Sequence, residues 1–307
     1  MISWERLRVF DAIAEHGSVG SAAEALHITG PAVTQQLRKL ERETGSKLVE
    51  PDGRGIRLTA AGYVLARHAR EVAGSVADAQ RELAGLQDEV AGPLRIGSLA
   101  SALRALMPEV LNVLTAAHPR LVPSLRDGEV FDLLPALRSR DLDAVLLESW
   151  TNRPERIPAG VRTTTLVTEP VMLAVPEDHA IADRYPAPLA ELAGEVWTSC
   201  PVGTGAYGAL VQLMRTHHVE PDIRYLVTDF TTQLSLVRAG LAIATVPGIA
   251  AVPPPPGVRF LSCVPAIGRS LVVATREQDT ELPALQALIG ALRDAARTAV
   301  EAAPEPS

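Results

Sequence analysis

The chain has 307 residues, of which 47% are hydrophobic, and a net charge of −7 at pH 7. This length allows two or three domains with sizeable cores, and the acidic balance argues against a protein that coats nucleic acid regardless of sequence. The sequence has neither an apolar run long enough to span a bilayer nor the basic start and apolar stretch of a signal peptide. We therefore expect a multidomain cytoplasmic protein without a membrane partner.

Residues 18–45 have the pattern of two short helices joined by a tight turn. Ser18 can cap the first helix, and Thr29, Gly30 and Pro31 can begin the second, where the missing N–H of proline costs nothing. In a helix-turn-helix the second helix lies in the major groove of DNA and the first crosses the backbone. We therefore predict that these four residues lie at or beside a DNA-binding surface.

The second helix has one apolar face and one polar face. Val33, Leu37 and Leu40 recur at helical spacing and would face inward, and Gly45 would end the helix. The alternative is an ordinary amphipathic helix, since Arg and Gln also occupy the wet faces of many globular proteins. The predicted DNA contacts on the outward face, with side chains able to pair with bases or phosphates, are Thr34, Gln35, Arg38, Lys39 and Arg42.

Neighbouring segments strengthen the DNA-binding hypothesis. An apolar stripe in residues 7–13 can complete a three-helix core, and β-prone runs flank a turn at residues 52–55, which predicts a hairpin. Arg54 at the tip of this hairpin and Arg57 beside it suit the minor groove or phosphates.

A long helix is predicted from Thr59 to about Asp88. Its apolar residues recur alternately four and three positions apart, the heptad pattern of a coiled coil that would join two copies of the chain. The alternative is a long helix packed on its own domain, although the sequence shows no other apolar partner for it. The predicted dimerisation seam consists of Leu65, Ala69, Val72, Val76, Ala79, Leu83 and Leu86.

After Gly92-Pro93 the pattern changes to alternating strands and helices, which implies a parallel sheet covered by helices. The first α/β unit contains predicted strands at 94–98, 121–125 and 141–147 and a helix around 103–116. The second contains segments at 163–167, 171–175, 207–217, 224–227, 234–239 and 242–247. A strand at 270–274 and a closing helix at 282–300 follow.

With these features the chain resembles the LysR-type transcriptional regulators. It departs from the family pattern at Gly30 and Gln35, where Gln and Arg are common, and at Val19 and Val49, which replace frequent Phe residues. The first two positions lie on or beside the DNA surface, so the resemblance implies no particular operator. The residues that carry it are Leu7, Phe10, Ala14, Gly17, Ser18, Ala22, Ala23, Leu26, Pro31, Ala32, Val33, Leu37, Leu40, Glu41, Gly45, Leu48, Gly53, Leu58, Thr59 and Gly62.

The resemblance implies three parts. A mainly α winged helix-turn-helix domain would span residues 1–59, a linker and dimerisation helix 60–90, and an α/β effector-binding domain 91–302. The last part would resemble a periplasmic binding protein of two subdomains. Subdomain I would comprise about 91–149 and 269–302, and subdomain II about 159–265.

Ligands in such α/β folds bind outside the carboxyl ends of strands, and the resemblance implies that these ends meet in one cleft. Hydroxyls at helix N-termini there favour a carboxylate or phosphate, whereas Asp127, Glu129 and Glu148 favour an amine or polyhydroxyl ligand. Each hydroxyl can equally be an ordinary helix cap. The predicted effector-binding residues are Ser98, Ser101, Glu129, Ser149, Thr204 and Thr231.

We therefore expect a sequence-specific DNA-binding transcriptional regulator, a homodimer and by family resemblance a tetramer on DNA, whose DNA binding or bending responds to a small-molecule effector. Two alternatives remain: a regulator with a vestigial cleft, and a small-molecule-binding or transferase protein whose N-terminal helices serve assembly only. The seven His residues form no metal-ligand spacing and no nucleophile motif occurs, so we expect no enzyme, metal or cofactor. Cys200 and Cys263 are expected to be buried free thiols rather than a redox switch.

Overall fold

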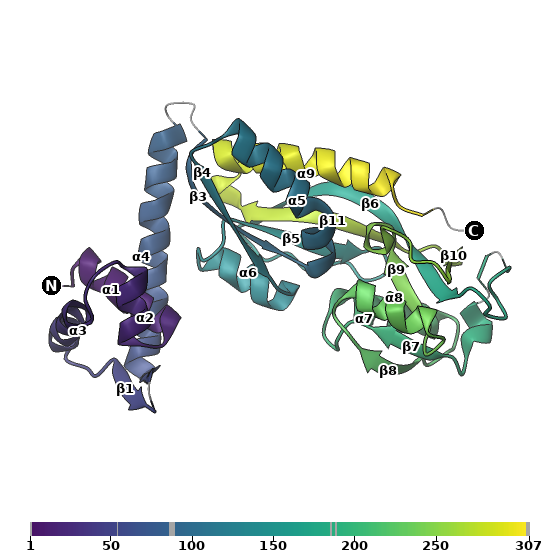
Figure 1. Cartoon of the computed structure of the whole chain (residues 1–307), viewed down its shortest axis with the longest axis horizontal. Coiled ribbons are helices and arrows are strands. Elements are labelled where there is room, and N and C mark those ends of the chain that lie inside the picture. The colour runs from purple at the N-terminus through teal and green to yellow at the C-terminus, as the bar shows by residue number, and fades with distance from the viewer. Residues whose placement is uncertain (1, 54, 86–89, 185, 188, 305–307) are drawn as a thin grey trace. The chain divides into compact units, whose positions relative to one another are not determined.

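The structure is a computed structural model that describes residues 2–53, 55–85, 90–184, 186–187 and 189–304 (Figure 1). It divides into two compact units, an N-terminal one and a larger one that contains the rest of the chain. Among the described residues, no helix combines the length and apolar character that crossing a bilayer requires.

The N-terminal unit is a winged helix-turn-helix followed by a long helix. Its elements are α1 (Trp4–His16), α2 (Val19–Ala25), α3 (Gly30–Thr44), β1 (Val49–Asp52), β2 (Gly55–Leu58) and α4 (Ala60–Gly85). The predicted caps are confirmed: Ser18 Oγ accepts a hydrogen bond from the Ser21 N–H, and Thr29 Oγ1 accepts one from the Ala32 N–H. Gly45 ends α3 in the left-handed conformation, at a φ of 65°.

One apolar core holds this unit together. Phe10 and Ile13 from α1 and Val33 and Leu40 from α3 are fully buried in it, which confirms the predicted three-helix core. The predicted hairpin is also confirmed, since β1 and β2 pair antiparallel. Arg54 at its tip lies outside the described residues.

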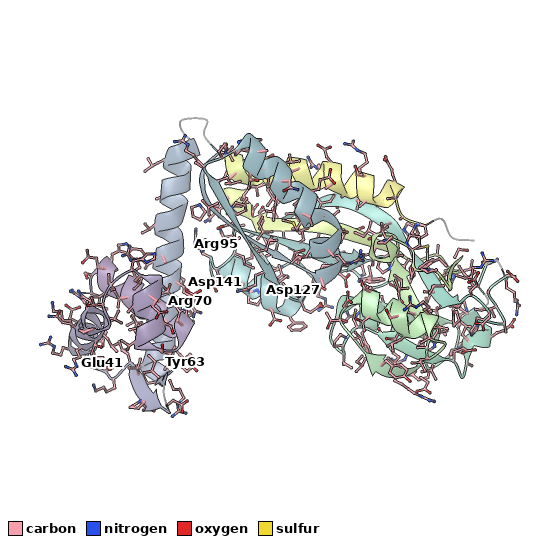
Figure 2. The ribbon with its side chains drawn as sticks, viewed as in Figure 1. Glu41, Tyr63, Arg70, Arg95, Asp127 and Asp141 are labelled. Carbon is pink, nitrogen blue, oxygen red and sulfur yellow. The ribbon has the colours of Figure 1, made fainter. Side chains whose placement is uncertain are left out.

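The start of α4 is fixed to this core. The Thr59 hydroxyl donates to the Lys47 carbonyl at 2.7 Å and accepts from the Gly62 N–H at 3.0 Å, so it caps the helix. Arg70, labelled in Figure 2, forms an ion pair with Asp11 of α1, with 3.4 Å between Nε and Oδ1. Burial raises the pKa of Asp11, and the Arg70 charge opposes that rise.

The second unit contains the remaining elements. They are β3 (Gly92–Ser98), α5 (Ala100–Ala117), β4 (Leu121–Asp127), α6 (Val130–Arg138), β5 (Ala144–Trp150), β6 (Val161–Pro176), β7 (Val196–Ser199), α7 (Gly205–Thr216), β8 (Asp222–Leu226), α8 (Phe230–Arg238), β9 (Ala244–Pro247), β10 (Val258–Ser262), β11 (Gly268–Arg276) and α9 (Pro283–Glu301). Short 3-10 turns occur at Leu189–Leu192, Gly248–Ala251 and Glu277–Asp279.

A seven-stranded sheet in the order β10-β6-β11-β5-β3-β4, with β9 also paired to β6, runs through this unit. Helices α5 and α9 pack on one face and α6 on the other (Figure 1). Along β11 the side chains alternate accordingly: Leu271 and Val273 join the first core, and Val272 and Ala274 the second.

The sheet corrects the predicted all-parallel arrangement. Only β3 is parallel to its neighbours β4 and β5, whereas β11 pairs antiparallel with β5 and β6. Strand β11 comes from the carboxyl-terminal part of the chain. Its direction in the sheet therefore does not follow from the local alternation of strands and helices.

Strand β6 also differs from the prediction, which placed separate strands at 163–167 and 171–175. The structure has one strand of 16 residues that changes partners along its length. Its first half pairs with β11 and its second half with β9 and β10. Strands β7 and β10 were not predicted.

A separate core surrounds Trp197 on β7, which is fully buried among side chains of α7, α8 and the second half of β6. Strands β7 and β8 pair in parallel beside it. The second unit therefore has two main hydrophobic cores. Strands β6 and β11 run from one of these cores toward the other.

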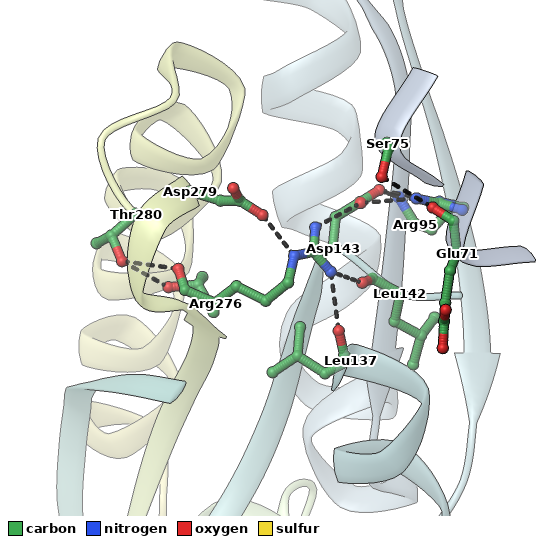
Figure 3. Close-up of polar contacts among 10 residues, drawn as sticks. Glu71, Ser75, Arg95, Leu137, Leu142, Asp143, Arg276, Asp279 and Thr280 are labelled. Atoms are coloured by element: carbon green, nitrogen blue, oxygen red, sulfur yellow. Dashed lines mark hydrogen bonds and ion pairs between the residues drawn. The ribbon is translucent and has the colours of Figure 1, made fainter. Parts of the chain in front are cut away.

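A buried guanidinium fixes one end of the sheet (Figure 3). Arg276 Nη1 donates to the carbonyls of Leu137 and Leu142 at 2.9 and 2.6 Å, and Nε donates to Asp279. Its Nη2 lies 3.3 Å from Asp143, which also accepts from Arg95. The network satisfies the carbonyl of Leu137 in the last turn of α6 and that of Leu142 in the segment before β5, and it joins both to β11.

Candidate DNA interface and ligand cavity

The outward face of α3 carries a polar surface groove. Pro31, Thr34, Gln35, Arg38 and Arg42 line it together, so five of the predicted DNA contacts lie on one surface. Gln35, Arg38 and Arg42 are exposed, whereas the Thr34 hydroxyl donates to the Gly30 carbonyl of its own helix at 3.0 Å. A long helix face bearing these side chains has the chemistry to contact base edges and phosphates.

A second groove continues around the end of α3. Lys47, which was not among the predicted contacts, lines it with Arg38 and Arg42. It lies 2.9 Å from Glu41, which is labelled in Figure 2. Burial alone would raise the pKa of Glu41, but hydrogen bonds from Lys47 and from the Leu48 N–H outweigh it and lower the pKa. A lysine two residues after the helix-ending glycine was the available sequence signal.

The other predicted DNA residues lie around this surface. Lys39 is half-buried, and Arg57 on β2 is exposed and pairs with Glu50 across the hairpin at 3.2 Å. Ser18 and Thr29 act as helix caps, as described above.

The predicted seam of α4 divides into two parts. Leu65 packs against the N-terminal core and Ala69 is fully buried, so their burial does not require a second chain. Val72, Val76 and Leu83 are exposed, at 40%, 37% and 64%. Ala79 is exposed as well, and Leu86 lies outside the described residues.

A small, partly open cavity lies where the core beneath α5 and α9 meets the core around Trp197. Its interior, about 10 Å³, has space for a single water molecule. Three predicted effector residues line it: Ser101, Glu129 and Thr204. The remaining lining residues are Leu99, Ala100, Glu148, Cys200, Thr228 and Phe230.

The other three predicted effector residues are not in this lining. Ser98 is fully buried and its hydroxyl donates to the Leu99 carbonyl at 3.1 Å. The Ser149 hydroxyl accepts from the Glu155 N–H, and Thr231 is exposed in the first turn of α8. Their roles in ligand binding therefore remain predictions.

An arginine that sequence reasoning missed lies directly behind the cavity. Arg269 on β11 is fully buried and donates to Glu169 through Nε and Nη2, at 2.9 and 2.6 Å. Its Nη1 donates to Ser101 Oγ at 2.9 Å and to Glu148 Oε2 at 3.3 Å. The Ile249 N–H donates to Glu169 as well, so this network joins three strands to the turn after β9.

The cavity is electrostatically acidic. Burial raises the pKa of Glu129 to about 7, and the nearby charges of Glu148, Asp127 and Asp132 add to the rise. Burial likewise raises the pKa of the Cys200 thiol to about 12. Cys200 and Cys263 are both free and buried, as predicted, and at neutral pH these thiols are un-ionised and poorly nucleophilic. In the part of the chain that the structure describes, no group of three His, Cys, Asp or Glu residues could hold a metal ion.

Two family models match the chain. One described as the LysR substrate binding domain matches residues 87–297, and one described as the bacterial regulatory helix-turn-helix protein of the lysR family matches residues 4–63. The uncharacterized HTH-type transcriptional regulator YnfL of Escherichia coli is 34% identical over 250 residues, which cover 80% of this chain and 82% of YnfL. The HTH-type transcriptional regulator CbbR of Rhodospirillum rubrum is 30% identical over 306 residues, 95% of this chain and 96% of CbbR.

Solved structures share the fold. A full-length OxyR variant from Pseudomonas aeruginosa superposes with a TM-score of 0.72 at 23% identity, covering 97% of this chain and 98% of the OxyR chain. CbnR in complex with its target DNA gives a TM-score of 0.67 at 24% identity, covering 96% and 100% of the two chains.

A winged helix-turn-helix followed by a long helix and an α/β effector-binding domain defines a class of DNA-binding transcriptional regulators. The chain belongs to the LysR family within this class, because the two family models together match most of its length. The predicted family and fold class are thereby confirmed.

Proposed function

We propose that the surface formed by the two grooves around α3 contacts operator DNA. Gln35 would contact bases, and Arg38, Arg42 and Lys47 would contact phosphates. The observation that carries this proposal is the grouping of exposed amide and guanidinium side chains on one face of α3. Amides can form paired hydrogen bonds with adenine, and Arg and Lys can bind guanine or phosphate. CbnR was solved as a complex with its target DNA, which agrees with such a surface in the family.

The exposed stripe of α4 supports the further proposal of a homodimer. Val72, Val76 and Leu83 are large apolar residues exposed on one long helix, and in this spacing they form a coiled-coil seam. Two copies would present two α3 helices to two operator half-sites, which raises affinity without new contacts in either copy. A tetramer on DNA would extend the same arrangement.

The cavity behind Ser101, Glu129 and Thr204 supports control by a small molecule. Residues of the core beneath α5 and α9 and of the core around Trp197 line this cavity, so a bound ligand would contact both cores. The ligand would therefore stabilise the arrangement of the two cores that binds it more tightly. We propose that the protein acts in the cytoplasm, where its operator lies, and that it regulates transcription without catalysing a reaction.

DNA selection followed by substitution tests the base-contact proposal. Fragments bound from the source genome define the operator, and the affinities of Gln35→Ala and Arg42→Ala are then measured on the operator and on single-base variants. Gln35→Ala should weaken operator binding by about 10- to 100-fold and relax preference at one base position. Arg42→Ala should weaken binding about equally on every sequence, because phosphates carry no sequence information.

Arg297→Ala is the matched control, since it removes one exposed guanidinium from α9, outside the helix-turn-helix. Its operator affinity should equal that of the unaltered protein. Equal losses on all sequences for Gln35→Ala and Arg42→Ala would refute the assignment of Gln35 to a base.

A further inference from the structure

We propose that the cavity holds the protonated primary amine of a small ligand, with Glu129 and Glu148 as its hydrogen-bond acceptors. The inference rests on the proposed ligand-controlled function and gives the chemical class of that ligand. It decides between the anionic and cationic effectors that the sequence left open.

Several acceptor oxygens at the cavity lack donors. Glu148 is only 7% exposed, and while its Oε2 accepts from Arg269, its Oε1 has no hydrogen-bond partner among the described residues. The Glu129 carboxylate, on a partly buried residue, has no such partner in the described ranges either. Gln233 does not line the cavity but lies against its residue Cys200: it is fully buried, its Nε2 donates to Cys200 Sγ at 3.5 Å and to the Val227 carbonyl at 2.6 Å, and its Oε1 is unpaired. A buried acceptor without a donor is costly, and an ammonium group carries three donors.

The charges around the cavity are also unbalanced. Both charged residues of the lining, Glu129 and Glu148, are acidic. The guanidinium behind them, Arg269, is shared between Glu148 and Glu169, so one cation faces two carboxylates before Glu129 is counted. An anionic ligand would add charge of the same sign to this site, whereas an ammonium would reduce the cost of burying the carboxylates.

One hydroxyl donor that would favour an anion is already engaged, because Thr204 Oγ1 donates to the Pro201 carbonyl and accepts from the Tyr207 N–H. The Thr204 hydroxyl therefore acts as the N-cap of α7. Ser101 Oγ accepts from Arg269 Nη1, so it faces a cation with its lone pairs and keeps its own proton to donate. The unpaired oxygens of Glu129 and Glu148 remain as acceptors for a ligand.

The size of the site suits an ammonium head group. The interior of the cavity holds one group of the size of a water molecule, and an ammonium group has nearly that size, so the rest of the ligand would extend through the open side. Gly205 keeps the approach to Glu148 open, because a Cβ at this position would lie 3.0 Å from Glu148 Oε1 and 3.1 Å from Trp150 Nε1. A bulkier quaternary ammonium would not fit.

Proton linkage gives the binding a characteristic pH dependence. Glu129 lies near the charges of Glu148, Asp127 and Asp132, Cys200 lines the same cavity, and Arg269 pairs with Glu148 behind it. The pKa of Glu129, about 7, lies above the ordinary value of 4.5. A cation binds the ionised carboxylate and lowers that pKa, so binding releases a proton. Affinity for an amine should therefore rise as the pH rises through about 7 and level off above it.

The test compares the thermal stability of the full-length protein in methylammonium chloride, sodium chloride, tetramethylammonium chloride and sodium acetate at equal ionic strength. At pH 8, about one unit above the pKa of Glu129, methylammonium should raise the Tm above that in sodium chloride by roughly 2–4 °C. The difference should shrink below pH 6 and vanish in Glu129→Gln. It should persist in Asp132→Asn, which removes the same charge from an exposed position nearby.

The proposal is overturned if methylammonium acts no differently from sodium, if tetramethylammonium stabilises equally, or if acetate is the stabilising ion. Operator affinity measured in the same salts distinguishes the proposed amine site from the proposed control of DNA binding by that site. Stabilisation by methylammonium with an unchanged operator affinity would uphold the amine site and contradict ligand-controlled DNA binding.

Discussion

Arg269 is a single side chain on which several distant segments depend. It holds Glu169, Glu148 and Ser101 while remaining fully buried, and Glu169 in turn accepts from the Ile249 N–H. A buried ion pair is not strongly stabilising when compared with a well-packed apolar substitute. Removing only one partner is different, because it leaves the other charges buried and unpaired.

Arg269→Met should therefore lower the free energy of unfolding by about 3–5 kcal/mol, measured by urea denaturation of the second unit's transition. Arg269→Lys should recover part of this loss, since it restores the charge but not the planar pair of donors to Glu169. Arg297→Met, which breaks an exposed pair with Asp294, should change stability by no more than about 0.5 kcal/mol. A normal stability for Arg269→Met would show that the network is dispensable.

The same residue shows why part of the site escaped prediction. Arg269 and Glu169 are 100 positions apart, and no periodicity or spacing relates them. Glu129 and Thr204 could be predicted because they follow strand ends, where α/β folds bind ligands. Thr228, Phe230 and Cys200 reach the cavity only through the packing of the core around Trp197, which local patterns do not specify.

At the scale of elements, local signals were sufficient for the N-terminal unit. Ser18, Thr29 and Gly45 act within a few residues of where they stand, so their capping roles were visible in the sequence. Strand β6 shows the opposite case. Its length depends on pairing with β11 and then with β9, both of which come from later in the chain. Pro170 lies at this change of partners and made one strand look like two.

The exposed stripe of α4 makes a prediction about assembly. Val76→Glu would place like charges opposite each other in the proposed seam and should convert dimers to monomers, with a halved mass by light scattering. Ser75→Glu adds the same charge at the edge of the seam, where the side chain stays in solvent, and should leave most of the protein dimeric with little change in mass. An unaltered mass for Val76→Glu and Leu83→Glu alike would exclude this seam.

At the scale of the whole molecule, charge is distributed unevenly along the chain. Residues 1–60 contain eight basic and eight acidic residues, so the net charge of −7 belongs to the remainder. The chain as a whole therefore repels DNA, and attraction must come from short-range contacts of Arg38, Arg42, Lys47 and similar side chains with phosphates. Affinity should then depend on how many such surfaces engage the operator at once.

Assembly and DNA binding are thus coupled in a measurable way. The slope of log affinity against log salt concentration counts the phosphates that are neutralised, at about 0.9 per contact. In the dimer, two copies of the α3 surface contribute, so Val76→Glu should reduce this slope to about half and weaken operator binding at every salt concentration. Fluorescence titration of labelled operator over a range of salt measures both quantities, with Ser75→Glu as the control. A full slope in a protein shown to be monomeric would mean that one α3 surface makes all the phosphate contacts, and the two-half-site arrangement would be wrong.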